Sequence, residues 1–307
     1  MKTLVLTLLI GLITLCFMLC LNFPVGAQTN FWNTSNAYLG QKPPSDSPKI
    51  FAPGLLADTG IAMDRVAFSA DGKEFYYCYA LHWFDSKGSK IKYFTYKNGK
   101  WNGPTVLNEE FYAPSFSSDD NTLFFIGGGV PGVVWQSQRT RNGWTKPAEY
   151  IRRNYGVYDF MTTRSGKMYV GSNGMQGNIK DFSTYNFCEI TISRKDTAIK
   201  SLEGPLNTAG FDGDFFIAKD ESYIIISTKE TKDYECELYI SFKKPDKTWG
   251  TPKSLGPLIN NGIAHRWGQY VTPDNKYLFY TQGTNEKDCH IYWVRFDTLF
   301  KKLQPSN

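Results

Sequence analysis

The chain has 307 residues, of which 16% are aromatic, with 27 glycines, 15 prolines and a formal net charge of +5. Lysines and arginines are scattered among acidic residues without a basic stripe, which argues against a nucleic-acid partner. The chain also lacks a long stretch of helical periodicity, and its strand-forming composition predicts an all-β fold.

The first 27 residues have the pattern of an export signal. Lys2 provides a positive start, residues 4–20 form an apolar run, and Val25-Gly26-Ala27 places small residues before a cleavage point at Gln28. We therefore expect an exported protein, in the periplasm or outside the cell, with no membrane span after cleavage. A retained anchor is the alternative, because about 17 to 20 apolar residues are marginally long enough for a span.

After a lead-in at 28–46, residues 47–307 are predicted to form one domain of five repeats. Each repeat holds a short apolar stretch, a turn related to Ser-x-Asp-Gly, and a run of aromatic and β-branched residues. The turns are 46 to 55 residues apart and begin at Ser69, Ser117, Thr163, Ala218 and Thr272. This period predicts a five-bladed β-propeller with one four-stranded blade per repeat. Asp and Gly favour tight turns, so we interpret the motif as structural.

The closing half of three repeats carries Trp-x-x-Pro, at Trp101, Trp144 and Trp249. The fifth repeat ends without this pattern, and a related stretch, 47–56, lies near the N-terminus instead. An open ring would leave an unpaired strand edge. We therefore expect residues 49–51 to supply the outer strand of the last blade and to close the ring.

Four cysteines follow the predicted signal: Cys78, Cys188, Cys236 and Cys289. They lack zinc-site spacing, and Asp212-Gly213-Asp214 offers few oxygens for calcium, so we expect neither metal nor cofactor. Cys188 and Cys236 occupy equivalent places in neighbouring repeats, and such places usually lie too far apart for a disulfide. Four buried, unpaired thiols are the prediction, and the disulfides that export would permit are the alternative.

Four segments carry a family resemblance: FSADGKEFYY from Phe68, FIAKDESYIII from Phe216, ELYISFKKPDKTWGTPKSLGPLIN from Glu237 and YVTPDNKYLFYTQG from Tyr270. They resemble the WD40-like propeller repeats of TolB-type exported bacterial proteins, over about residues 38–294. The likeness is greatest to single-domain members with a similar YLGQKPP lead-in. It implies the propeller fold and a binding role, because the named relatives bind partners. Ser165 and Asp120 depart from the turn pattern, so their repeats could sit differently in the ring.

Functional residues of propellers usually gather at the mouth of the central channel, where the inner strands begin. Counting back from the turns places eight candidate ligand-binding residues there: Asp64, Arg65, Tyr158, Asp159, Asp214, His265, Arg266 and Trp267. We expect further residues on the same face, namely Tyr112 and Asp212. Three loops should also lie there: one carries His82 and Trp83, one begins at Gly127 and one begins at Ser172. Aromatic rings beside Asp, Arg and His suit a peptide segment or a sugar. The alternative is that Asp and Arg only pair with each other across the channel.

Two function classes remain open. We expect a monomeric, non-catalytic propeller that binds a partner protein or a glycan at this mouth. The alternative is a glycoside hydrolase or polysaccharide lyase in which Asp64, Asp159 and Asp214, from three blades, act as acid, base or nucleophile. The flanking motifs of five-bladed glycoside hydrolases are absent from the sequence, which favours binding.

Overall fold

The computed structural model describes residues 30–57, 59–83, 87–128, 132–153, 156–172, 185–192, 197–208, 210–228, 231, 233 and 235–305. The predicted signal peptide, 1–27, lies outside these residues, as do residues 84–86, 129–131 and 173–184 of the three loops expected at the channel mouth. None of the described helices has the length and hydropathy of a membrane span.

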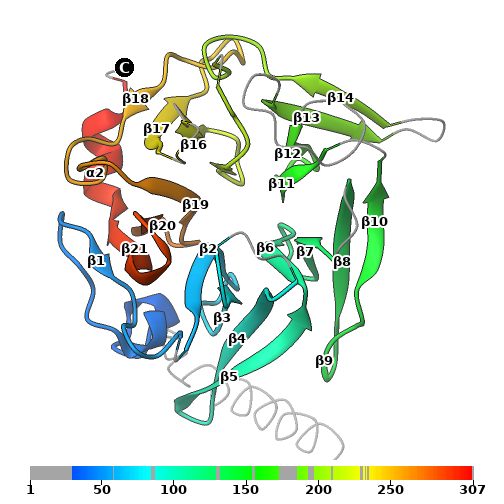
Figure 1. Cartoon of the computed structure of the whole chain (residues 1–307), viewed down its shortest axis with the longest axis vertical. Helices are drawn as coiled ribbons and strands as arrows, with labels where there is room; N and C mark the ends of the chain where they lie inside the picture. The colour runs from blue at the N-terminus through cyan, green and yellow to red at the C-terminus, as the bar shows by residue number, and fades with distance from the viewer. Residues whose placement is uncertain are drawn as a thin grey trace, which may run out of the picture.

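Five sheets stand in a ring (Figure 1), which confirms the predicted five-bladed propeller. We number the blades in chain order. Blade 1 contains β2 (Ile61–Phe68), β3 (Glu74–Ala80), β4 (Lys90–Lys97) and β5 (Lys100–Glu109). Blade 2 contains β6 (Phe111–Phe116), β7 (Thr122–Gly127), β8 (Val133–Thr140), β9 (Gly143–Trp144) and β10 (Ala148–Arg152). Blade 3 contains β11 (Tyr158–Thr162), β12 (Met168–Ser172), β13 (Asn186–Ile192) and β14 (Thr197–Ser201).

The last two blades complete the ring. Blade 4 contains β15 (Phe215–Ile217), β16 (Tyr223–Thr228), β17 (Glu237–Phe242) and β18 (Lys253–Ser254). Blade 5 contains β19 (His265–Val271), β20 (Tyr277–Gly283), β21 (Cys289–Arg295) and, as its outer strand, β1 (Lys49–Ile50). Lys49 pairs with Trp293, and the Phe51 amide donates to the Ile291 carbonyl at 2.8 Å. The predicted closure of the ring by an N-terminal strand is therefore confirmed.

All five turns join the first two strands of a blade, as the sequence predicted. In each, the amide of the fourth residue donates to the carbonyl of the first, for example Gly72 to Ser69 at 2.9 Å and Glu221 to Ala218 at 2.8 Å. The fourth residue has a positive φ in every turn, including 58° at Asp120, where the pattern lacks glycine. The departures at Asp120 and Ser165 therefore change the side chains and leave the turn intact.

The four cysteines are buried, and none forms a disulfide with another described residue, as predicted. Many of the buried core residues are aromatic, and rings of neighbouring blades pack against each other. Phe51 of the closing segment lies within 5.3 Å, centroid to centroid, of Phe75, Phe279 and Trp293. The closing strand thus contributes a core side chain at the junction of blades 5 and 1.

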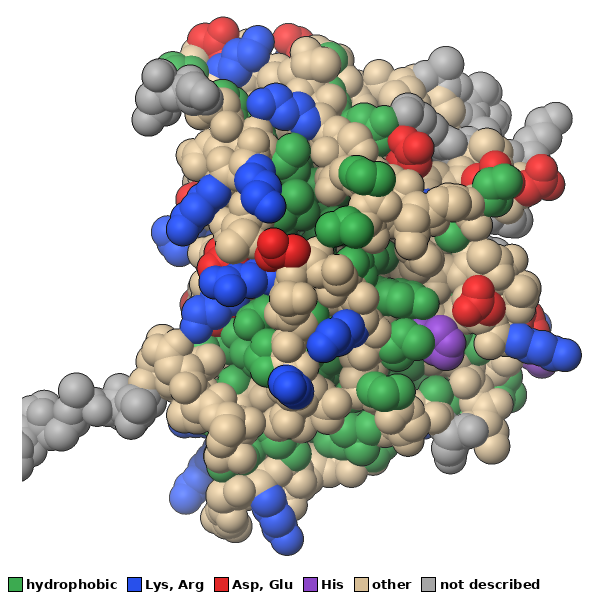
Figure 2. Space-filling view, turned by 90° about the vertical axis from the view of Figure 1, so that its left-hand side faces the viewer, with side chains coloured by type: hydrophobic (Ala, Val, Ile, Leu, Met, Phe, Trp, Pro, Cys, Tyr) green, Lys and Arg blue, Asp and Glu red, His purple; other side chains and the backbone are tan. Residues whose placement is uncertain are grey.

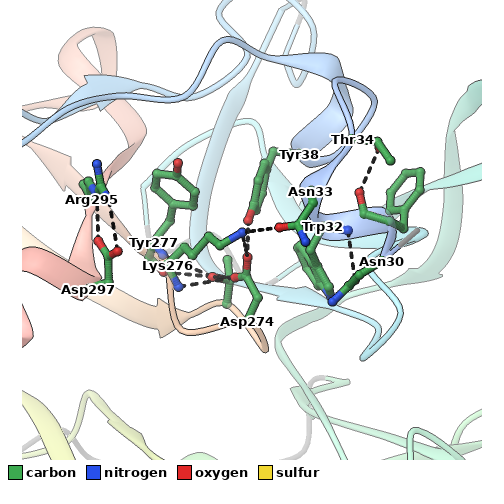
Figure 3. A network of polar contacts seen from close by, with 12 residues as sticks. Asn30, Trp32, Asn33, Thr34, Tyr38, Asp274, Lys276, Tyr277, Arg295 and Asp297 are labelled. Carbon is green, nitrogen blue, oxygen red and sulfur yellow. Dashed lines mark hydrogen bonds and ion pairs between the residues drawn. The ribbon is translucent and has the colours of Figure 1, made fainter. Parts of the chain in front are cut away.

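The lead-in packs onto the ring as a clasp, which the sequence had not indicated. It contains the short helices η1 (Phe31–Asn33) and η2 (Tyr38–Gly40). Trp32 Nε1 donates to the Ala70 carbonyl of blade 1 at 2.9 Å. Tyr38 Oη donates to Asp274 Oδ2 of blade 5 at 2.5 Å, as Figure 3 shows. We call this segment, residues 30–40, the N-terminal clasp. It spans the seam between the first and last blades on the face that carries the turns.

The chain ends in helix α2 (Phe296–Leu303), beside blade 5 in Figure 1. Phe296 and Phe300 lie against Tyr223 of blade 4, with ring centroids 5.7 and 5.0 Å away. Phe300 also contacts Phe242, at 5.3 Å. The helix therefore bridges blades 4 and 5 on the turn side of the ring.

Candidate functional site

The inner strands of blades 1, 2, 3 and 5 are bulged near their starts. Their pairing registers shift between Met63 and Ala67, Tyr112 and Ser115, Tyr158 and Met161, and Trp267 and Tyr270. Asp64 and Asp159 have φ values of 65° and 56° within these bulges. A bulge re-aims the side chains beside it, and here it brings predicted site residues of different blades together.

Arg65 and Asp159 form a buried ion pair across the channel. Arg65 Nη2 donates to Asp159 Oδ2 and, at 2.6 Å, to the Phe215 carbonyl of blade 4. Nη1 donates to the Phe160 carbonyl at 3.3 Å, and the Phe215 amide donates to Asp159 Oδ2 at 3.3 Å. Burial raises the pKa of Asp159, and the Arg65 cation opposes that shift. The pair links blades 1, 3 and 4. It matches the alternative raised from the sequence, in which Asp and Arg pair with each other across the channel.

The other two predicted carboxylates also face the protein. Asp64 Oδ1 accepts from the Arg65 amide at 2.7 Å, and Asp214 is 3% exposed. The Asp214 carbonyl accepts from Gln269 Nε2 of blade 5 at 2.7 Å. Neither of the two cavities described below is lined by Asp64, Asp159 or Asp214. Asp64 is half-buried, and the burial of Asp159 and Asp214 differs from the open pair of carboxylates that glycoside hydrolysis requires.

His265 and Trp267 belong to a small satellite core at the strand-start face. Their rings stack with centroids 4.2 Å apart, and the Trp83 ring stands edge-on to both, at 6.4 and 6.0 Å. His265 and Trp267 are buried, together with Cys289. A cavity of about 500 Å³ lies at the seam of blades 5 and 1, beside residues that include His82. The aromatic residues expected at this mouth are thus brought together, but they are packed against each other.

The Arg266 side chain binds the backbone of the loop that precedes β19. Its guanidinium donates to the carbonyl oxygens of Ile259, Asn261 and Gly262 at 2.9, 2.5 and 3.1 Å, and to that of Cys236 at 3.0 Å. Its side chain is buried, and burial lowers its pKa. These contacts organise the segment before β19 and give Arg266 a structural environment. Tyr158 is half-buried, with its ring against Phe211 at 5.3 Å, so it remains partly open to a ligand.

A larger cavity lies at the opposite end of the channel, on the face that carries the turns. Its volume is about 1500 Å³. The ends of inner strands, blade 4 and α2 contribute to its lining. We call it the turn-face cavity. Its aromatic lining residues are Phe68, Phe116, Phe216, Tyr223, Phe242, Tyr270, Phe296 and Phe300.

The lining of the turn-face cavity has an excess of cations. The basic residues are Arg164, Lys219, Lys243, Lys244, Lys253 and Lys301, and the acidic residues are Asp120, Asp220 and Asp297. Figure 2 views the molecule from the side of β1 and α2, and Lys and Arg side chains gather along the left edge of that view beside hydrophobic side chains.

The lysines differ in how they are held. Lys219 Nζ donates to the Phe116 and Thr162 carbonyls at 2.6 and 2.9 Å, and its burial lowers its pKa to about 8. Lys243 Nζ pairs with Glu221 at 2.7 Å. By contrast, Arg164, Lys244 and Lys301 are exposed and make no ion pair with another described residue. Three cations at the rim are therefore available to an anion.

Hydroxyl and amide groups are also frequent in the lining: Ser115, Ser117, Ser118, Ser222, Thr251, Thr272, Asn275 and Gln304. Ser115 is 3% exposed, and its Oγ has no hydrogen-bond partner among the described residues. A buried hydroxyl without a partner is unfavourable unless water or a ligand satisfies it. The sequence analysis missed this cavity because it placed the ligand site at the face where the inner strands begin. Arg164 and Lys219, which lie in two of the turns, could have indicated a basic face on the turn side.

No protein-family model matches this chain, and no curated protein sequence does. Several solved structures are similar in outline. TolB from Acinetobacter baumannii has a TM-score of 0.43 at 12% identity, over 75% of this chain and 54% of TolB. A putative 6-phosphogluconolactonase from Bacteroides uniformis has a TM-score of 0.40 at 15% identity, over 74% of this chain and 67% of that one. A thermostable family-43 glycoside hydrolase has a TM-score of 0.46 at 14% identity, over 76% of this chain and 89% of that one. Structural likeness this distant conveys nothing about activity.

Proposed function

We propose that the protein is an exported, non-catalytic binding propeller whose ligand, a glycan or a protein segment, enters the turn-face cavity. The observation that supports this most is the cavity itself, about 1500 Å³ and lined by aromatic, cationic and hydroxyl side chains. Concave sites with an apolar lining and a few convergent polar groups are the usual form of ligand sites. The predicted signal peptide, residues 1–27, supports export.

The predicted carboxylates favour binding over catalysis. A glycoside hydrolase needs one carboxyl group that protonates the leaving oxygen and another that attacks or activates water, both in contact with the substrate. Asp159 is instead engaged by Arg65 and the Phe215 amide, and Asp214 is buried. The turn-face cavity holds three other acids, of which Asp297 accepts from Arg295 Nε at 2.8 Å and Asp120 accepts from the Ala70 amide.

The test is a thermal-unfolding screen against neutral and acidic oligosaccharides and short peptides. A ligand at a hundredfold its Kd stabilises the folded state by about 2.7 kcal/mol, which raises the midpoint by about 5 °C for a protein of this size. Ser118 and Thr251 line the cavity and are exposed, so Ser118→Trp and Thr251→Trp should fill it without unfolding the protein. Both variants should lose the ligand-induced shift.

Thr284→Trp, at an exposed position beside β20 on the strand-start face, is the matched control and should keep the full shift. If the ligand-induced rise in the midpoint were lost in Thr284→Trp and kept in Ser118→Trp, the ligand would bind on the strand-start face instead. Hydrolysis or elimination of any ligand, abolished by Asp64→Asn, Asp159→Asn or Asp214→Asn, would contradict a non-catalytic role.

A further inference from the structure

We infer that the turn-face cavity takes an acidic oligosaccharide, a chain of hydroxyl-rich rings that bears carboxylate or sulfate groups. The inference rests on the proposed function and adds the chemical class of the ligand. Charge, hydrogen-bonding capacity and the shape of the cavity's outer wall each point to this class.

Charge favours an anion. Six cationic and three acidic side chains line the cavity, and Lys219 and Lys243 are already engaged by protein groups. The rim residues Arg164, Lys244 and Lys301 are exposed and make no ion pair with another described residue. They come from blades 3 and 4 and from the C-terminal helix, so they surround the opening instead of forming one surface run. Such a rim attracts a ligand with several negative charges in preference to a single one.

Hydrogen-bonding capacity favours a hydroxyl-rich body. Eight Ser, Thr, Asn and Gln side chains line the cavity. A lipid-like anion would cover these groups with hydrocarbon and leave them unpaired, at a cost for each of them. The Ser118 and Thr251 side chains line the cavity and are exposed, so their hydroxyl groups can bond to sugar hydroxyls. Phe242 and Phe300, which pack against each other, are half-buried and line the cavity, so their partly exposed rings are available for contact with sugar rings.

The outer wall disfavours an extended peptide. Peptides commonly bind by adding a strand to an exposed sheet edge. The outermost strand of blade 4, β18, has only two residues, and the exposed Lys253 side chain reaches from it to the Leu303 carbonyl of the C-terminal helix at 2.9 Å. An edge this short offers few backbone groups to an added strand, which favours recognition through side chains.

The test is calorimetric titration of the protein with four probes. They are the tetramer of galacturonic acid, its fully methyl-esterified form, a heparin-derived tetrasaccharide and hexaglutamate. At least one acidic saccharide should bind, and its affinity should fall as salt rises, because the rim cations are exposed to solvent. Lys244→Gln combined with Lys301→Gln should weaken that binding about tenfold, from about 0.7 kcal/mol for each exposed charge pair.

Two further variants distinguish loss of contacts in the cavity from a change in overall charge or in stability. Lys97→Gln combined with Lys100→Gln removes the same charge from β4 and β5, away from the cavity, and should leave the affinity unchanged. Ser118→Ala removes an exposed hydroxyl of the lining, so the unfolding midpoint should stay while affinity falls about fivefold.

Each contrary result has one meaning. Equal affinity for the methyl ester, or tighter binding of hexaglutamate with the same dependence on Lys244 and Lys301, would overturn the acidic saccharide and keep the cavity as the site. Binding of an acidic saccharide that Ser118→Trp and Thr251→Trp leave unchanged would overturn the proposed site itself. No heat from either acidic saccharide would also overturn the inference.

Discussion

Arg65 of the first blade and Asp159 of the third form an ion pair inside the channel, 94 residues apart in sequence, with both side chains buried. The pair also engages the Phe215 backbone of the fourth blade. Two residues predicted at a ligand-binding mouth are therefore part of the ring's internal support, and the ligand site is proposed at the opposite face.

Arg65→Met should lower the free energy of unfolding by about 3 to 5 kcal/mol, because it leaves the Asp159 carboxylate buried without its cation. Adding Asp159→Asn should recover part of that loss. Urea unfolding at pH 7 measures both. Arg152→Met, which breaks an exposed pair with Glu149, is the control and should cost less than about 1 kcal/mol. Equal losses for Arg65→Met and Arg152→Met would contradict the structural role of the buried pair.

Trp32→Ala should destabilise the protein by about 3 to 5 kcal/mol, as expected for a buried tryptophan. Trp32 is 5% exposed, and its ring lies 5.5 Å from that of Phe68. Trp32→Phe should cost less, since it removes the hydrogen bond to Ala70 and keeps an aromatic ring in the clasp. Ile263→Ala, at a 71% exposed position, should change little. A midpoint unaltered by Trp32→Ala would show that the clasp is not part of the folded core.

Deleting residues 28–51 should leave a destabilised or aggregating chain. The deletion removes the clasp, the outer strand β1 and the Phe51 ring, so β21 becomes an unpaired edge and a hydrophobic face is opened. Size-exclusion chromatography and thermal unfolding provide the measurement. A truncated protein that elutes as a monomer and melts like the full mature form would refute closure by the N-terminal strand.

Glu221→Gln should remove a pH-dependent part of the stability. Burial opposes ionisation of Glu221, but hydrogen bonds from Lys243, Ser165 and Tyr169 outweigh it and lower its pKa from 4.5 to about 2. The folded state then binds fewer protons than the unfolded state, so this contribution is present above about pH 4.5 and is lost as the pH falls towards 2.

The difference in unfolding free energy between wild type and Glu221→Gln should therefore shrink from pH 6 to pH 2 in urea titrations. Glu203→Gln, at an exposed pair with Lys200, is the control and should show a small difference throughout. A constant difference for Glu221→Gln over this range would mean that its ionised form is not stabilised by folding.

The four thiols should resist alkylation in the native protein and all react after unfolding. Burial raises the pKa of Cys188 and Cys289 to about 12, and it raises that of Cys78 as well, so little thiolate forms at pH 8. Mass spectrometry of peptides labelled without reductant measures this. A pair that labels only after reduction would reveal a disulfide, and fast labelling of native Cys236 would contradict its burial.

Local patterns in the sequence were sufficient for the architecture. The turns from Ser69 to Thr272, their spacing and the strand signals between them predicted five blades, because turn chemistry and side-chain alternation act over a few residues. Residues 47–56 resemble the Trp-x-x-Pro stretch that the fifth repeat lacks. They predicted β1 as well, since only the last blade lacked an outer strand. The four buried thiols were predicted because the cysteines lack zinc-site spacing and because equivalent places in neighbouring repeats lie too far apart for a disulfide.

The tertiary structure alone decided which side chains are available to a ligand. Arg65 and Asp159 meet through bulges in two inner strands, and Arg266 bonds to a loop that precedes its own strand, neither of which is encoded in residue spacing. The clasp and the C-terminal helix reach the turn face by long-range packing of Trp32, Tyr38 and Phe300. A cavity exists where distant elements fail to fill space, so its position depends on the assembled ring and on no local stretch of sequence.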